Sequence, residues 1–237
     1  KYIFETKDLV IGYNEPLSRP VTLSMERGNK IALVGANGIG KTTLLKSILG
    51  LIPSLKGSCE LGENLQIGYF EQEVKGDNKT TCIDEIWAEF PSYTQYEVRS
   101  ALAKCGLTTK HIESQVRVLS GGEQAKVRLC KLVNKETNIL LLDEPLGALD
   151  AFTRMNMQDE ILNIWREQKQ TVVMVTHDVE EAIYMGTRVL VMEPRPGRVK
   201  ADIPIELAEP KQRDSEEFQA YRNRILKMLD LKHHTDY

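Results

Sequence analysis

Residues 35–42, GANGIGKT, form a glycine-rich segment that ends in a lysine and a threonine. The segment matches the pattern G-x-x-x-x-G-K-[ST] in full, between a predicted strand and a predicted helix. Gly38 and Gly40 allow backbone N–H groups to close around phosphate oxygens. Lys41 supplies a positive charge to the outer phosphates, and the Thr42 hydroxyl can ligate Mg²⁺. The alternative is a glycine-rich turn with a surface lysine, but the strand–loop–helix context favours phosphate binding.

Two adjacent carboxylates, Asp143 and Glu144, end the apolar run ILLLDE. In a phosphate-binding α/β fold, ligands lie at the carboxyl ends of the parallel strands. Asp143 is therefore predicted to hold Mg²⁺, directly or through water. Glu144 is predicted to point elsewhere and to polarise an attacking water as general base. The alternative is a solvated strand end or a helix cap, which the GKT segment upstream makes the weaker interpretation.

A second glycine-rich segment, LSGGEQ at residues 119–124, lies at a predicted helix start. Ser120, Gly121 and Gly122 would there form a second anion-binding helix end. Taken alone, the same residues are also consistent with an ordinary capped helix.

Three isolated polar residues complete the pattern. Gln72 follows a predicted strand and offers an amide that can reach a metal or a water. Asp150 ends LGALD, just past the carboxylate pair. His177 ends the apolar run TVVMVTH, where an imidazole could contact a terminal phosphate or orient the water at Glu144. Each signal is weak alone, since a glutamine after a strand is usually surface and a histidine at a strand end is usually structural.

The elements that must position these residues alternate between strands and helices, which predicts a parallel α/β core. We expect antiparallel strands at the start and a hairpin around residues 62–64. An amphipathic helix is expected between the strand that ends in Asp143 and Glu144 and the strand that ends in His177, and it should bury an apolar face. The predicted strands are 2–13, 21–28, 30–35, 59–61, 65–72, 138–144, 171–177 and 188–192. The predicted helical segments are 42–50, 80–106, a helix from 121, one bearing Phe152, Met155, Leu162 and Trp165, and 215–230.

Composition narrows the class of protein. The chain has 237 residues, a net charge of −3, 41% hydrophobic and 27% charged residues, as in ordinary globular proteins. Nothing in the global charge indicates nucleic acid or an anionic membrane. The four cysteines are widely spaced, which argues against a zinc site. No apolar run approaches the roughly 20 residues of a membrane span, and no signal peptide is recognisable at the start. Because the first residue is Lys1, we expect a trimmed chain or a piece of a longer protein.

In motif order, the chain resembles the nucleotide-binding domain of ABC ATPases over nearly its whole length. The resemblance rests on GANGIGKT, Gln72, LSGGE, ILLLDE, LGALD and His177. It implies a P-loop α/β fold, with a parallel RecA-like core, an antiparallel β-subdomain and a small helical subdomain. The implied single domain covers 1–237, as β-subdomain with P-loop and Q-loop (1–75), helical subdomain (76–118), catalytic core (119–206) and helical tail (207–237).

The resemblance also implies ligands and partners. ATP and Mg²⁺ are the expected cofactors, and two domains would pack head to tail, each signature segment closing over the other's ATP. Tyr13 would stack on adenine, a core tyrosine being the alternative. The expected site residues are Glu144, His177 and Gln72 for catalysis, and Thr42, Gln72 and Asp143 for the metal. The expected nucleotide-binding residues are Tyr13, Gly35, Asn37, Gly38, Gly40, Lys41, Thr42, Thr43, Ser120, Gly121, Gly122 and Asp150.

The two ends of the chain resemble different branches of the family. Residues 1–145 are similar to the ABC-F branch, whose soluble proteins act on ribosomes, and residues 146–237 to ATPase subunits of nitrate, sulfonate and taurine importers. The change near Pro145 suggests a recombined or engineered chimera. Three functions follow as hypotheses: a transporter ATPase with a membrane permease, located in the cytoplasm or at the inner face of the plasma membrane; a fragment of a ribosome-associated factor; and an ATP-binding domain without a physiological partner.

Overall fold

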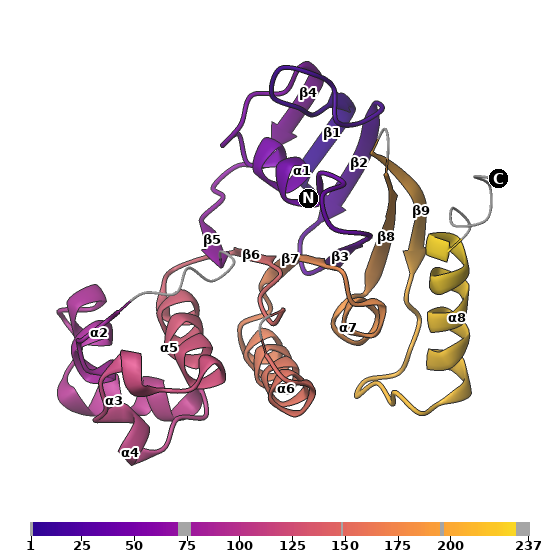
Figure 1. Cartoon of the computed structure of the whole chain (residues 1–237). Coiled ribbons are helices and arrows are strands. Elements are labelled where there is room, and N and C mark those ends of the chain that lie inside the picture. The colour runs from indigo at the N-terminus through magenta and orange to yellow at the C-terminus, as the bar shows by residue number, and fades with distance from the viewer. Residues whose placement is uncertain (1, 71–76, 148, 195–196, 231–237) are drawn as a thin grey trace. The chain divides into compact units, whose positions relative to one another are not determined.

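The computed structural model describes residues 2–70, 77–147, 149–194 and 197–230 (Figure 1). Its internal contacts divide the chain into two units, and each is described by itself. The first unit contains Lys1–Leu65, Leu141–Glu144 and Gln170–Tyr237, and the second contains Gln66–Leu140 and Pro145–Lys169.

A three-stranded antiparallel sheet with the order β2-β1-β4 opens the first unit. Its strands are β1 (Tyr2–Val10), β2 (Val21–Glu26) and β4 (Lys56–Leu61). Thr6 is fully buried within this sheet, and its hydroxyl donates to the Val21 carbonyl oxygen at 3.0 Å. The antiparallel strands predicted at the start of the chain are therefore confirmed.

The hairpin predicted around residues 62–64 is wrong. β4 pairs with β1, with Leu61 opposite Phe4, and the Gly62 N–H donates to the Ile3 carbonyl oxygen at 2.8 Å. The following strand, β5 (Ile67–Phe70), lies in the second unit and outside this sheet. The glycine thus continues the pairing with β1 and does not turn the chain back on β4.

Five neighbouring strands of a six-stranded, mostly parallel sheet form the core of the first unit, in the order β6-β7-β3-β8-β9. β3 is paired in parallel with both β7 and β8, which confirms the predicted parallel core, and every residue of β3 and β7 is buried. The last strand, β9, runs antiparallel to β8 and was not predicted from the sequence. The strands are β3 (Lys30–Val34), β6 (Ile139–Asp143), β7 (Thr171–Thr176), β8 (Arg188–Glu193) and β9 (Arg198–Pro204).

Three helices belong to the same unit: α1 (Lys41–Ile48), α7 (Val179–Met185) and α8 (Glu216–Asp230). α7 packs against β3 and α8, and α8 also contacts β8, as Figure 1 shows. Phe218 and Ile225 on α8 have no exposed surface, which confirms the predicted helix near the end of the chain.

Lys211 is a buried lysine whose side chain reaches the end of α7 from the segment before α8. Its Nζ donates to the carbonyl oxygens of Ile183, at 2.8 Å, and Gly186, and lies 3.9 Å from Glu209 Oε1. Burial lowers the pKa of Lys211 to about 8, although Glu209 opposes this shift and Lys30 adds to it. An unfolded lysine has a pKa of about 10.4. Because the unfolded chain then binds more protons between these two pH values, stability rises with pH in that window.

We expect Lys211→Met to flatten this pH dependence. Between pH 8 and about pH 9.5, the free energy of unfolding of the natural chain should gain roughly 1.5 kcal/mol relative to the variant. Thiols whose pKa burial raises, such as Cys59 and Cys82, affect both proteins alike and cancel in the comparison. Urea unfolding at the two pH values measures the effect, and equal changes in the two proteins would contradict it.

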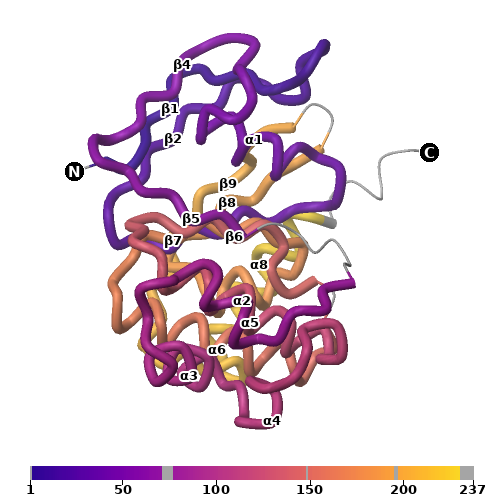
Figure 2. Tube along the Cα trace, turned by 90° about the vertical axis from the view of Figure 1, so that its left-hand side faces the viewer, coloured from indigo at the N-terminus to yellow at the C-terminus, as the bar shows by residue number. Residues whose placement is uncertain are grey.

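The second unit is mainly helical. Figures 1 and 2 both show α2 and α3 beside α5, and α5 also contacts α6. The helices predicted within residues 80–106 and from Gly121 are confirmed. Within the described part of the chain, no helix combines the length and the apolar character needed to cross a membrane. The helices are α2 (Cys82–Glu89), α3 (Gln95–Lys104), α4 (Thr109–Ile112), the 3₁₀ helix η1 (Val116–Val118), α5 (Gly121–Asn134) and α6 (Ala151–Gln168).

The apolar face predicted for α6 is only partly buried. Met157, Ile161 and Leu162 are at most 5% exposed, but Phe152 is 75% and Met155 is 45% exposed. Of the residues predicted for this face, Leu162 is buried, and Phe152 lies about 80° around the helix from it at about 100° per residue. The prediction therefore holds for Leu162 but not for Phe152 and Met155, and the first turn of α6 presents large apolar side chains to solvent.

Candidate functional site

The glycine-rich loop of residues 35–40 connects β3 to α1. Gly38 and Gly40 have φ angles of 76° and 91°, a left-handed conformation that glycine adopts without strain. Gly40 is the N-cap of α1, and no side chain caps this helix or places a carboxylate in its first turn. The positive end of α1 is therefore open to an anion, which is the arrangement that the predicted phosphate binding requires.

Lys41 is held inside the loop. Its side chain is 4% exposed, and Nζ donates to the carbonyl oxygens of Gly35 and Ala36 at 2.7 and 2.9 Å. Nζ also lies 3.9 Å from Glu144 Oε1. Burial lowers the pKa of Lys41, while the charges of Glu144 and Asp143 act against this shift. The glycine-rich turn with a surface lysine is thus excluded.

Asp143 lies opposite the first turn of α1. The Thr42 hydroxyl donates to Asp143 Oδ1 at 2.9 Å, and Asp143 is 5% exposed. A hydroxyl and a carboxylate oxygen side by side are the ligand types that Mg²⁺ prefers. These two residues therefore fit the predicted metal, and Asp143 is not a solvated strand end.

Glu144 is directed away from Asp143, toward Lys41 and His177. Its φ of 43° is unusual for a residue other than glycine, and its N–H donates to the Val175 carbonyl oxygen at 2.8 Å. Oε2 lies 3.0 Å from His177 Nδ1, and because a carboxylate can only accept, Nδ1 carries the proton. The first unit thus brings Lys41, Thr42, Asp143, Glu144 and His177 together.

Three backbone carbonyl groups in this site were not predicted. Those of Gly35, Ala36 and Val175 position Lys41 and Glu144. No sequence signal could have found them, because every residue carries a carbonyl group.

The second glycine-rich segment caps its own helix in this structure. The Ser120 hydroxyl accepts from the Glu123 N–H at 3.3 Å, and the Glu123 carboxylate accepts from the Ser120 N–H at 2.8 Å. Asp150 likewise caps α6 by accepting from the Thr153 N–H at 3.0 Å. Within one chain, Ser120 and Asp150 therefore act as the N-caps of α5 and α6. A nucleotide contact from Ser120, Gly121, Gly122 or Asp150 remains a prediction.

The remaining predicted residues differ in what the structure says of them. Tyr13 is 63% exposed in the turn after β1, so it is not a core tyrosine and its ring is available for stacking. Asn37 is exposed on the loop and Thr43 is half-buried in α1. Gln72 lies outside the described residues.

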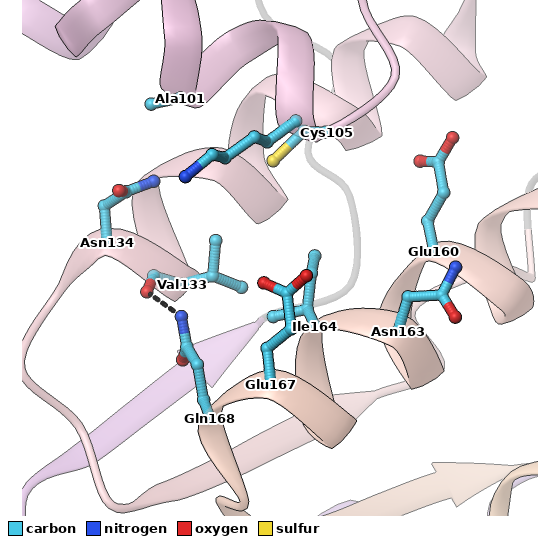
Figure 3. Close-up of a pocket in the computed structure, with 10 residues that line it drawn as sticks. Ala101, Cys105, Val133, Asn134, Glu160, Asn163, Ile164, Glu167 and Gln168 are labelled. Carbon is cyan, nitrogen blue, oxygen red and sulfur yellow. Dashed lines mark hydrogen bonds between the residues drawn. The ribbon is translucent and has the colours of Figure 1, made fainter.

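A cavity in the second unit contains none of the predicted site residues. It has a volume of about 270 Å³ and lies among α3, α5 and α6, where Gln168 Nε2 donates to the Val133 carbonyl oxygen at 3.0 Å (Figure 3). Glu160 and Glu167 contribute carboxylates to its lining, and Lys104 contributes an amine. No glycine is among the residues that line it, and its two carboxylates would repel a phosphate.

Comparison with protein families identifies this arrangement. Residues 18–147 match the family model described as ABC transporter. The chain is 66% identical over 178 residues to a Bacillus subtilis protein called uncharacterized ABC transporter ATP-binding protein YfmM. That match covers 75% of this chain but 34% of the relative, so the chain spans about a third of that protein's length.

Other relatives match along most of their length. The chain is 38% identical over 219 residues to the aliphatic sulfonates import ATP-binding protein SsuB of Bacillus licheniformis, covering 89% of this chain and 86% of that protein. The SsuB of Bacillus subtilis is 35% identical, with coverages of 92% and 88%. Among solved structures, the dimeric MJ0796 cassette bound to ADP and Pi shares the fold, with a TM-score of 0.69 at 22% identity, covering 86% of this chain and 99% of that one.

Proposed function

Because the chain belongs to the ABC transporter family and is a Mg²⁺-dependent ATPase, we propose that it is the ATP-hydrolysing subunit of a membrane importer and works as a head-to-tail dimer. The observation that carries the proposal is its similarity to two importer ATPases along most of their length. The importer role, the dimer and the permease go beyond the family itself and are tested below.

In this proposal the loop of residues 35–40 and the start of α1 bind the phosphates of ATP. Gly38 and Gly40 direct backbone N–H groups at the oxygens, supported by their left-handed φ angles. Lys41 exchanges its bonds to loop carbonyl oxygens for bonds to the outer phosphates. Tyr13 stacks on adenine, while Gly35, Asn37 and Thr43 complete the cradle.

Thr42 and Asp143 hold the metal in this proposal, because their oxygens lie side by side at 2.9 Å. When bound, Mg²⁺ neutralises negative charge on the phosphate oxygens. Gln72 is proposed as a further ligand from the sequence pattern alone.

Glu144 acts as the general base. His177 Nδ1–H binds Oε2, which leaves Oε1 as the oxygen that accepts a proton from the attacking water. His177 then acts as a positioning residue that fixes the orientation of the carboxylate. Lys41 Nζ lies 3.9 Å from Oε1, so the general base and the phosphate-binding charge are neighbours in the site.

A second copy supplies the other wall of the site. Ser120, Gly121 and Gly122 form a helix start whose N–H groups can face the phosphates bound by a partner, and Asp150 lies at the neighbouring helix start. In the isolated chain these residues cap their own helices, so this contact depends on the dimer.

A further proposal concerns the origin of the chain, which we infer joins two branches of the family near Pro145. It rests on the resemblance of residues 1–145 to the ABC-F branch and of residues 146–237 to importer ATPase subunits. The 66% identical match to YfmM covers 178 residues and therefore extends past Pro145. Separate comparison of residues 1–145 and 146–237 tests it. An equally good fit of both parts to one branch would remove it.

Partner capture tests the importer role. We expect a tagged chain expressed in a bacterial cell to sediment with membranes and to co-purify with a permease. Co-sedimentation with ribosomes in high salt would instead favour the ABC-F-type alternative, which rests on the resemblance of residues 1–145. Recovery in neither fraction would favour an ATP-binding domain without a physiological partner.

A further inference from the structure

A cavity of about 410 Å³ adjoins the phosphate-binding loop in the first unit. Gly35, Ala36 and His177 line it next to the catalytic residues, and residues near the end of α8 also line it. Glu193, which also lines the cavity, is paired with Arg198 at 2.5 Å and with Lys200 at 3.6 Å. The other walls are apolar and come from Val179, Met192, Pro194, Leu226, Met228 and Leu229. The cavity therefore suits an apolar group rather than a charged one.

The second unit presents a group of that kind. Phe152 is 75% and Met155 is 45% exposed in the first turn of α6, directly after Asp150. A Cβ added to Gly122 would lie 2.4 Å from the Thr153 methyl, so this turn packs closely on the start of α5. Phe152 therefore lies at the same end of the second unit as Ser120–Gly122. Water-exposed phenylalanine beside a predicted dimer contact indicates a surface that is covered in the assembly.

We infer that Phe152 of each copy inserts into the cavity beside the phosphate-binding loop of its partner. The inference rests on the proposed head-to-tail dimer, in which the signature segment of one copy faces the loop of the other. That arrangement brings the end of the unit that carries Phe152 toward the face where Gly35, Ala36 and His177 line the cavity. The group that fills the cavity is thus the exposed Phe152 ring of a second copy of this chain.

Insertion would connect dimerisation to the reacting groups. The partner's Phe152 would press on the backbone that accepts from Lys41 and on the histidine that positions Glu144. Phe152 is therefore a positioning residue. Because a symmetric dimer contains the contact twice, the free energy lost with the contact is counted twice in the free energy of dimerisation.

The first test measures dimerisation by light scattering with ATP and Mg²⁺, in a Glu144→Gln background that slows turnover of the bound ATP. We expect Phe152→Ala to lower the dimer association constant about 100-fold. Phe152→Leu should recover most of the affinity. Tyr96→Ala, which truncates another ring that is 80% exposed, should have no effect. In the chain with Glu144 intact, turnover by Phe152→Ala should recover at high protein concentration, which damage within the site would not allow.

A cross-link locates the contact. Phe152→Cys combined with Leu226→Cys should form an intermolecular disulfide under mild oxidation only with ATP, and Tyr96→Cys with Leu226→Cys should not. If the Glu144→Gln protein dimerises with ATP but Phe152→Ala dimerises equally well and no cross-link forms, the cavity contact is wrong and the dimer stands. If the Glu144→Gln protein remains monomeric with ATP, the proposed dimer fails and this contact fails with it.

Discussion

Glu144→Gln is expected to bind ATP as tightly as the natural chain and to hydrolyse it at least about 100-fold more slowly. Glutamine has the shape of glutamate and can keep a hydrogen bond with His177, so the site retains its geometry. It cannot accept a proton from water, and it removes the charge that lies 3.9 Å from Lys41 Nζ. Calorimetry with ATP measures binding, and release of phosphate measures turnover.

A control must separate the role of Glu144 from the effect of removing any one carboxylate charge. A matched control is Glu206→Gln, which makes the same change at an exposed glutamate of the same unit. We expect that control to turn over ATP at the natural rate. Turnover by Glu144→Gln at the rate of the control would remove the general-base assignment, while loss of ATP binding would instead assign Glu144 to nucleotide binding.

The local motifs predicted the centre of the site because their chemistry depends on residues that are adjacent in sequence. GANGIGKT forms a loop and a helix start by itself, and Asp143 ends a strand that its own apolar run defines. Contact between Thr42 and Asp143 followed from a general rule, that ligands bind at the carboxyl ends of parallel strands. The prediction that Glu144 points elsewhere than Asp143 agrees with their different partners, His177 for Glu144 and Thr42 for Asp143.

Features decided by distant parts of the chain were not predictable in this way. The turn signal at Gly62 is the same whether the chain folds back on β4 or continues along β1, and only pairing with Phe4 decides between them. The φ of 43° at Glu144 reflects its bond to Val175 on the neighbouring strand. On α6, spacing alone did not separate Phe152 from the buried stripe at Met157, because burial depends on which helix lies opposite.

Lys41→Ala is expected to weaken ATP binding by at least about 100-fold. The ammonium group donates to carbonyl oxygens of the loop, and hydrogen bonds to charged groups contribute about 1.5–3 kcal/mol each. The substitution also leaves the Gly35 and Ala36 carbonyl oxygens without their donor and Glu144 without its cation. Loop carbonyl oxygens directed at the vacated position would repel a phosphate, so the loss should exceed that of one hydrogen bond.

A second lysine on the same helix separates this effect from a loss of structure. Lys46→Ala changes the last turn of α1, away from the loop, and should bind ATP normally. Both variants should melt near the natural temperature without ligand, because burial of the Lys41 charge, which lowers its pKa, already costs stability. ATP should then raise the melting temperature of Lys46→Ala but not of Lys41→Ala. Tight ATP binding by a folded Lys41→Ala protein would mean that the backbone N–H groups of the loop and the start of α1 hold the phosphates without this charge.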